Sequence, residues 1–444
     1  MAVVSGRLVL CGVAMGVIYG YDSGAIAGAL LFIPDDLGLS TPATQSLTAV
    51  TIAGYLVGAL GAGRLAEAVG RKAAMTLSVV GYVAFALLAA AASGLVWLDV
   101  ARFLLGVAIG VVLVTVPVFL GESASTGSRG SMVVVFQVST VAGIMLGYLV
   151  DFLLAGSGAW RWMLGGAAGL GVLALVALRG VPDTPRWYVS KGRFAEAEAA
   201  LRRTEPGADF AEAVAEMRAS WQAERGGSAR ELWRLPYLRA TAFVVALGFL
   251  VQITGISAIG YYGPFIFAGM GFTGHAALLL LPAAVQGVGL AAGLVALSLV
   301  DRLGRRPVLL AGVAGMVVAD LVLVWALADQ GRGAAGFAGV LLFTAAFNAG
   351  LGSVVWVYAA ESFPARLRLA GASVMLTCNL VANFLVAQFF LSSLESLGAS
   401  GTFGVLLGFA ALAWVFLWRL APETRERPLE SVRAFWENGG RWPD

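Results

Sequence analysis

Long apolar stretches follow one another through almost the whole chain, and this feature excludes most folds. Each stretch has about 20 residues, the length that an α-helix needs to cross ~30 Å of hydrocarbon. The stretches are continuous rather than alternating, so helices are predicted and a membrane β-barrel is not. Charged residues make up 12% of the chain, against roughly 25% in soluble domains. We therefore predict an all-α multi-pass membrane protein with twelve transmembrane helices, at residues 7–32, 43–65, 73–93, 96–120, 130–154, 161–180, 238–268, 275–300, 307–328, 335–360, 369–394 and 402–420.

The chain also contains an internal duplication. Residues 63–72 and 299–307 carry the same pattern of an acid, a glycine and an arginine, at a constant offset of 234 residues. Two further charged motifs recur at offsets of 239 and 240 residues, namely Glu122 with Arg129 as Glu361 with Arg368, and residues 182–186 as 422–425. A repeat of this length predicts two pseudo-symmetric bundles of six helices each.

The lysines and arginines indicate the orientation in the membrane. With twelve spans, 26 of the 29 cations fall on one face, which the positive-inside rule makes cytoplasmic, together with both termini. Only Arg161 and Arg332 lie on the other face, and Arg102 lies inside a span. The net charge of +3 therefore reflects the orientation of the chain in the membrane and does not indicate binding to nucleic acid. We expect a protein of the cell membrane.

Four parts are predicted along the chain. Residues 1–180 and 237–421 are the two bundles, 181–236 is a cytoplasmic loop, and 422–444 is a cytoplasmic tail. Within the loop, alanine, glutamate and arginine recur at helical spacing from Arg193 to Arg225, which predicts surface helices. A disordered linker is the alternative.

The chain is poorly supplied for soluble-enzyme chemistry. His275 is its single histidine, and Cys11 and Cys378 both lie in apolar spans. No histidine-based triad and no histidine–cysteine metal cluster can be assembled from these residues. A nucleotide-binding glycine loop ahead of a Lys-Ser or Lys-Thr pair is also lacking. We predict neither an enzyme, nor a metal site, nor an organic cofactor.

Taken in order, the motifs resemble the sugar porter family of the major facilitator superfamily over nearly the whole chain. The resemblance implies two six-helix halves that rock about a central site and give alternating access to it. The residues that carry it are Gly20-Tyr21-Asp22-Ser23-Gly24, 63–72, Glu122 with Arg129, 182–187, 252–256, Tyr261-Tyr262, 301–306 and 422–424.

The family resemblance assigns the repeated charges to a cytoplasmic gate. Charge-assisted pairs hold a closed state and can still be broken by solvent when it opens. The alternative is a plain positive-inside stop signal with incidental carboxylates. One departure from the family is Glu67-Ala68, where Asp-Arg is usual, so the amino-terminal copy is expected to close more weakly. The predicted gate residues are Glu67, Arg71, Glu122, Arg129, Asp183, Arg186, Asp301, Arg305, Arg306, Glu361, Arg368 and Glu423.

Asp22 and Arg102 are intramembrane charges at comparable depth in the first bundle. Counting residues from the outer ends of their spans puts them ~15 Å and ~9 Å inside. Because each such charge costs about 2.5–3.5 kcal/mol, we predict a pair in which Asp22 carries the proton and Arg102 tunes its affinity. An Asp at the position of Asp22 is typical of the family's proton-coupled members. A static salt bridge is the alternative. Asp320, in a peripheral span, is interpreted as an interfacial or locally paired residue.

Sugar recognition needs amides that match hydroxyl groups and aromatic faces that pack on the ring. Several family contacts are missing, because Ser257 replaces an asparagine, Leu380 an aromatic residue, and Gly289 a span 8 asparagine. Packing between helices is the alternative role for any one amide. By resemblance, the substrate-binding candidates are Gln137, Gln252, Ser257, Tyr261, Trp356, Asn379, Tyr19, Phe347, Asn348 and Asn383.

These observations predict a secondary active transporter, a proton-coupled symporter for a hexose-like or pentose-like sugar. The predicted partners are a sugar or polyol and the lipid bilayer, without nucleic acid, and the protein is expected to act as a monomer with the proton as coupling ion. An uncoupled facilitator for a sugar, a polyol or a less hydroxylated substrate is one alternative. A non-transporting nutrient sensor is the other.

Overall fold

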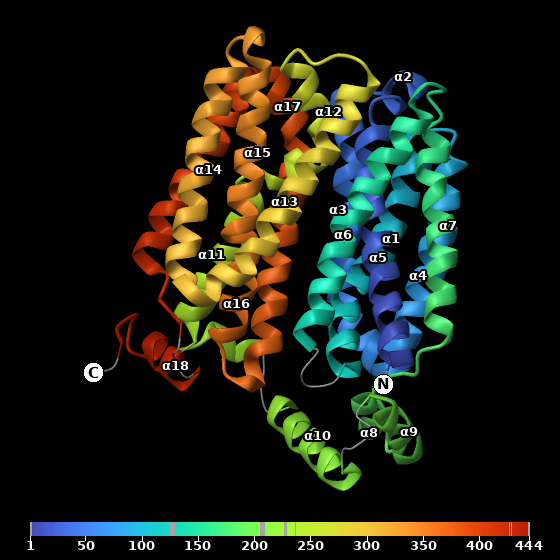
Figure 1. Ribbon diagram of the computed structural model, residues 1–444, viewed down its shortest axis with the longest axis vertical. Helices are drawn as coiled ribbons and strands as arrows, with labels where there is room; N and C mark the ends of the chain where they lie inside the picture. The colour runs from blue at the N-terminus through green and yellow to red at the C-terminus, as the bar shows by residue number, and fades with distance from the viewer. Residues whose placement is uncertain are drawn as a thin grey trace. The chain divides into compact units, whose positions relative to one another are not determined.

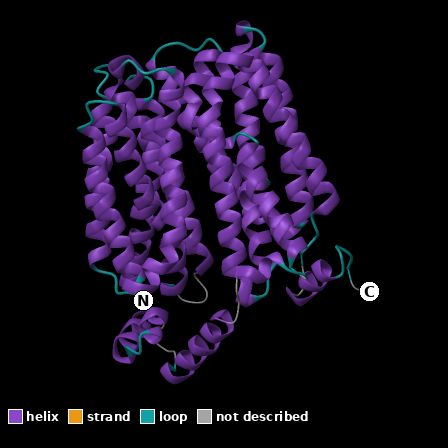
Figure 2. Ribbon diagram, turned by 180° about the vertical axis from the view of Figure 1, so that it is seen from behind, coloured by secondary structure: helices purple, strands orange, loops and turns teal. Residues whose placement is uncertain are grey.

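The computed structural model describes residues 2–124, 129–204, 209–225, 229–235, 237–425, 427 and 429–442. Its contacts divide the chain into two compact units, Met1–Gln222 and Ala223–Asp444. The described residues form helices, turns and loops without a strand (Figures 1 and 2). This confirms the all-α prediction. The four-part division predicted from the sequence stays a prediction.

The first unit is a bundle of six long helices. The sequence builds them from the predicted apolar stretches, with boundaries that differ by a few residues. The long helices are α1 (Ala2–Ala29), α3 (Thr41–Val69), α4 (Arg71–Ala90), α5 (Leu95–Ser123), α6 (Arg129–Ala155) and α7 (Trp160–Arg179). Short helices are α2 (Ile33–Leu37), α8 (Pro185–Ser190), α9 (Phe194–Thr204) and α10 (Phe210–Arg225). The last two lie where surface helices are predicted.

The second unit repeats this plan, with interruptions. Its long elements are α11 (Leu238–Ile253), α12 (Ile256–Gly269), α13 (His275–Leu303), α14 (Arg305–Leu327), α15 (Gly333–Ala349), α16 (Leu351–Glu361) and α17 (Ala365–Leu420). The smaller elements are η1 (Ala229–Trp233), η2 (Gln330–Arg332) and α18 (Leu429–Glu437).

Glycines explain where the second unit departs from six uninterrupted helices. The stretches predicted as single spans at 238–268 and 335–360 are each two helices, broken at Gly255 and at Gly350. Gly255 has φ +105°, a conformation that favours glycine. Within α17, Gly398 leaves the helical region (φ 71°, ψ 168°) and separates the last two spans. The described residues hold eleven candidate membrane segments, and α17 supplies two spans because of this kink.

Helices α1 and α6 pack backbone to backbone in the first unit. A Cβ added at Gly20 would lie 1.8 Å from the carbonyl oxygen of Thr140. A Cβ at Gly24 would lie 2.3 Å from the carbonyl oxygen of Ile144. Lipid offers no hydrophobic drive for helix association, so such contacts replace it. This glycine seam holds α1, the helix that carries Asp22, against its neighbour.

Candidate functional site

Asp22 and Arg102 form a buried ion pair in the middle of the first unit. Asp22 lies on α1 and is 3% exposed, and Arg102 lies on α5 and is 2% exposed. Arg102 Nη1 donates to Asp22 Oδ1, and Nη2 lies 3.5 Å from Oδ2. Tyr55, on α3, donates its hydroxyl to Asp22 Oδ2 at 3.0 Å. The depth estimate from the sequence thus brings the right two residues together, and their part in proton coupling stays a prediction.

The pair lies in an apolar, close-packed setting. Tyr19 meets Tyr55 edge to face at 6.1 Å, and the hydroxyl of Tyr82 donates to the carbonyl of Ile18. One donor remains unused, because Arg102 Nε has no hydrogen-bond partner among the described residues. The carboxylate of Asp22 is therefore held by one guanidinium and one phenol and is shielded from solvent.

In the second unit, three predicted substrate residues form one polar cluster at the break between α11 and α12. Gln252 Nε2 donates to Asn379 Oδ1 at 3.3 Å, and the hydroxyl of Ser257 donates to Gln252 Oε1. Asn379 Nδ2 donates to the carbonyl of Gly248 at 3.3 Å. Interrupted membrane helices commonly supply such sites, because the break turns polar groups toward the ligand.

A second amide lies in the same unit on α15. The Nδ2 atom of Asn348 would lie 2.8 Å from a Cβ added at Gly289. The amide therefore fills the space above Gly289, the position at which the family resemblance expects an asparagine. A neighbouring helix thus supplies an amide at the position where the sequence lacks the expected asparagine.

The remaining substrate candidates differ in accessibility. Gln137 and Trp356 are exposed on the surfaces of their units, Trp356 by 47%, and Tyr19 is half-buried. Tyr261, Phe347 and Asn383 are buried, and Asn383 Oδ1 has no hydrogen-bond partner among the described residues. The exposed aromatic ring and amide can meet a ligand without rearrangement, whereas the buried ones need a change in packing.

Glu122 is the centre of the charged cluster in the first unit. It accepts from Arg71 Nε at 3.1 Å and Nη2 at 3.4 Å, and from the hydroxyl of Thr184 at 2.7 Å. Arg186 Nη1 lies 4.0 Å away. Glu67 takes no side-chain part in this cluster, since its side chain is exposed and its backbone carbonyl accepts from the indole of Trp187 at 3.1 Å.

Asp183 and Glu423 bind backbone amides, in contrast to the side-chain pairs that the gate prediction implies. Asp183 accepts from the N–H groups of Arg71 (3.1 Å), Lys72 (3.2 Å) and Thr184 (2.8 Å). The helix α4 starts directly after Gly70, so the carboxylate caps its N-terminus. Burial raises the pKa of Asp183, and these N–H donors offset the effect only in part.

Glu423 repeats this arrangement in the second unit. It accepts from the N–H groups of Arg305 and Arg306, both at 3.1 Å, at the start of α14. A Cβ at Gly70 would lie 2.2 Å from Asp183 Oδ2, and one at Gly304 2.6 Å from Glu423 Oε2. In each unit, the duplicated acid–glycine–arginine motif therefore forms a turn at a glycine. Because this glycine has no side chain, a carboxylate from a distant part of the sequence can reach the N-terminus of the next helix.

The other gate candidates of the second unit are more loosely arranged. Arg305 Nη2 lies 3.9 Å from Glu361 Oε1, and Arg306 Nη2 donates to the carbonyl of Trp418 at 2.7 Å. Arg368 Nε has no hydrogen-bond partner in the part of the chain that the structure describes. The side chains of Arg129 and Asp301 lie outside the described residues.

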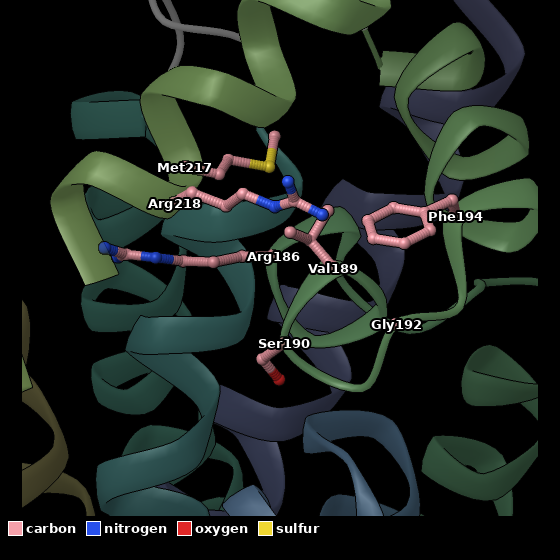
Figure 3. A pocket seen from close by; sticks show the side chains of 7 residues that line it. All are labelled: Arg186, Val189, Ser190, Gly192, Phe194, Met217 and Arg218. Atoms are coloured by element: carbon pink, nitrogen blue, oxygen red, sulfur yellow. The ribbon is translucent and has the colours of Figure 1, made fainter. Parts of the chain in front are cut away.

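A cavity of about 360 Å³ adjoins the charged cluster between the turn after α8 and α10. Arg186 and Arg218 lie along it and extend in opposite directions, with Arg218 reaching toward Phe194 (Figure 3). Arg186 therefore borders both Glu122 and an opening on the surface of the first unit.

At the other end of the first bundle, Asp36 fastens α2 to the start of α7. It accepts from Trp160 Nε1 at 3.0 Å and Arg161 Nη1 at 2.9 Å, and Arg161 Nη2 donates to the carbonyl of Ala92. The hydrogen bonds from Arg161 and Trp160 lower the pKa of Asp36.

Sequence reasoning missed two contributors to these sites and one further buried carboxylate. Tyr55 and Thr184 gave no signal, because a single hydroxyl in a span or a loop has many uses. Asp151, on α6, is a carboxylate close to the end of a predicted span, and its charge alone could have drawn attention to it.

The fold and the buried pair define a class, that of multi-pass membrane proteins with six spans in each half and an intramembrane ion pair. A family model described as "Sugar (and other) transporter" matches residues 8–436, and the chain belongs to this family. The family prediction is therefore confirmed.

The relatives and a solved structure agree with this membership. The chain is 34% identical to the galactose-proton symporter of Escherichia coli (strain K12) over 426 residues, covering 94% of this chain and 91% of that protein. It is 33% identical to the arabinose-proton symporter of the same strain, with 94% and 90% covered. The major facilitator superfamily proton:xylose symporter XylE from E. coli matches with a TM-score of 0.80 at 24% identity, covering 98% and 99% of the chains. The last match shows the fold, and the predicted twelve-helix major facilitator fold is confirmed.

Proposed function

We propose that the protein is a proton-coupled sugar symporter that works by alternating access. The observation that carries the proposal is the buried Asp22–Arg102 pair with its Tyr55 hydrogen bond. Membership in the sugar transporter family and likeness to two proton symporters for sugars support it.

In this proposal Asp22 is the proton carrier. The guanidinium of Arg102 favours the ionised carboxylate, and separation of the two groups inside the bundle favours the protonated form. A movement of α1 against α5 would change this separation. Proton binding and the change of access are thereby linked through one ion pair.

The polar cluster of Gln252, Ser257 and Asn379 is proposed to bind sugar hydroxyl groups. Each amide offers both donors and an acceptor, which matches a hydroxyl. Asn348 is proposed as a further amide contact, and the exposed ring of Trp356 as an apolar face for the sugar. A pentose or hexose fits this chemistry, and the departures from the family pattern leave room for a polyol.

The charged clusters are proposed to form a gate at the cytoplasmic face. Glu122 with Arg71 and Glu361 with Arg305 are charge-assisted contacts that solvent can replace. The proposal includes location in the cell membrane with both termini in the cytoplasm, action as a monomer, no enzymatic activity, no cofactor, and the proton as the coupling ion.

The test is transport in proteoliposomes. Labelled galactose, arabinose, xylose, glucose and polyols are supplied with and without an imposed pH gradient. We expect uphill accumulation of at least one sugar with the gradient, and its loss in the Asp22→Asn variant with counterflow exchange retained. Equal accumulation by wild type and Asp22→Asn would show that Asp22 is not the coupling site. Equilibration that ignores the gradient in wild type would assign a uniporter, and no transport of any compound would favour a sensor.

A further inference from the structure

Asp151 is a buried carboxyl that the proposed function leaves without a role. It lies on α6, four residues before the helix ends at Ala155, and is 0% exposed. Neither carboxyl oxygen has a hydrogen-bond partner among the described residues. The four-residue separation corresponds to ~6 Å from the helix end. An acidic group is therefore enclosed inside a membrane-spanning segment, and no cation of the described residues is bonded to it.

The carboxyl of Asp151 lies at the end of the glycine seam, which is the row of close contacts that Gly20, Gly24 and Gly28 of α1 make with α6. Through Gly24 the seam is made of backbone contacts, whereas the next glycine, Gly28, faces a side chain. A Cβ added at Gly28 would lie 2.2 Å from Asp151 Oδ2 and 2.5 Å from its Cγ. The backbone amide of Gly28 faces the carboxyl without a hydrogen bond of ordinary geometry. At Gly28, therefore, α1 contacts a polar side chain of α6, whereas at Gly20 and Gly24 it contacts backbone atoms of α6.

The ionisable groups around Asp151 do not offset a negative charge. Among the described residues, Tyr21 on α1 and Tyr148 on its own helix are the titratable groups that interact with it. Arg161, at the start of α7, is bonded to Asp36 and to a backbone carbonyl. On α5, Arg102 is paired with Asp22.

An ionised carboxylate in hydrocarbon costs about 2.5–3.5 kcal/mol even on insertion scales, and more when no donor compensates it. We propose that Asp151 is a second proton-binding group of the first unit. Its carboxyl holds a proton while it is packed on Gly28, and exchanges that proton with water when α1 separates from α6 at Gly28. The inference rests on the proposed proton-coupled function, because the same segment of α1 carries Asp22. Asp22 and Gly28 are six residues apart, which is ~9 Å along the helix.

This arrangement links the two carboxyls mechanically. A displacement of α1 that separates Asp22 from Arg102 also acts on the contact between Gly28 and Asp151, six residues further along the same rigid helix. Water that reaches this contact replaces the missing hydrogen bonds and permits ionisation. Opening of the seam therefore exposes a second proton site without a second moving helix.

The first test is infrared spectroscopy of the purified protein in lipid, which reads protonated carboxyl groups directly and needs no substrate. We expect wild type at about pH 7 to show a protonated-carboxyl C=O component that Asp151→Asn lacks and Asp320→Asn retains, and expect this component to weaken as the pH is raised. Asp151→Ala is made as well, since its smaller side chain cannot crowd the seam. Asp320→Asn is the matched control, because Asp320 is an equally buried carboxyl, without partners among the described residues, on α14 of the second unit.

The second test is the pH dependence of counterflow exchange. With Asp22→Asn, we expect exchange of labelled galactose to retain a change of about threefold or more between pH 5 and pH 9, and the Asp22→Asn/Asp151→Asn double variant to lose it. A carboxyl spectrum that is unchanged in both Asp151 variants, or an Asp151-dependent component that is the same at every pH, would overturn the proposal. Failure of the proposed function is distinguished by a different experiment, the transport assay, in which the wild type would then show no gradient-driven accumulation.

Discussion

Replacing Gly70 by alanine is expected to destabilise the first unit by about 3–5 kcal/mol. Gly70 has φ +103° and ψ 154°, a region that essentially only glycine occupies, and a side chain there costs about 1–3 kcal/mol. The new Cβ would also lie 2.2 Å from Asp183 Oδ2. The carboxylate must then move away from the amides of Arg71 and Lys72, and loss of hydrogen bonds to a charged acceptor costs about 1.5–3 kcal/mol.

Gly192→Ala separates the two contributions. Gly192 also has a positive φ, of 71°, but a Cβ there meets nothing within 4 Å. It should therefore show the conformational cost alone, about 1–2 kcal/mol. Thermal unfolding of the purified protein in lipid nanodiscs measures both variants. For a unit of this size, we expect Tm to fall by about 6–20 °C for Gly70→Ala and by about 2–8 °C for Gly192→Ala.

A double-mutant cycle with Asp183→Ala tests the cause. Part of the destabilisation by Gly70→Ala comes from displacement of the Asp183 carboxylate, and this part is absent when Asp183 is already alanine. The double variant should therefore be more stable, by about 1.5 kcal/mol or more, than the sum of the two single losses of stability predicts. Additivity within about 0.5 kcal/mol, or equal losses for Gly70→Ala and Gly192→Ala, would refute the close contact between the glycine turn and the carboxylate.

Three further predictions concern separate parts of the molecule. Glu122→Gln keeps the shape of the cluster and removes its charge, so we expect a loss of about 1–3 kcal/mol in thermal unfolding and a lower rate of uptake; an unchanged Tm would count against the role of Glu122 as its centre. Gln252→Ala removes an amide from the proposed sugar cluster and should raise KM about tenfold or more in uptake assays, whereas an unchanged KM would remove Gln252 from the site. Because the pKa of Asp36 is lowered in the folded protein, its contribution to stability is present above the ordinary aspartate range and is lost as the pH falls through the lowered value. Unfolding at a series of acidic pH values should therefore converge for wild type and Asp36→Asn, and a constant difference would contradict this sign.

The residues show why some of the site could be predicted and the rest could not. Depth along a helix follows from counting residues, so the sequence brought Asp22 and Arg102 together from different spans. The choice between a side chain and a backbone amide as partner depends on the path of a turn. Asp183 was therefore assigned to the gate charges, although the turn at Gly70 directs it to the start of α4.

The breaks in the second unit illustrate the same limit. Hydropathy alone treats 238–268 as one span, because Thr254 and Gly255 do not lower the average enough to divide it. Gly255 has a positive φ, and the break there places Gln252 and Ser257 on either side of it. The amide of Asn348 above Gly289 likewise depends on which helices are neighbours, which one sequence does not state.

The two carboxylate caps also constrain the order in which the halves can be completed during synthesis. Arg71 and Asp183 are 112 residues apart, and Arg305 and Glu423 are 118 apart. Each cap joins an early turn of its bundle to a segment made after the sixth span of that bundle. The first bundle can therefore close before any span of the second is translated, since domains generally fold as units from the N-terminus. The second bundle lacks its carboxylate cap until residue 423 has been added. A ribosome that pauses between residues 183 and 423 would therefore carry a first bundle with its cap and a second bundle without one.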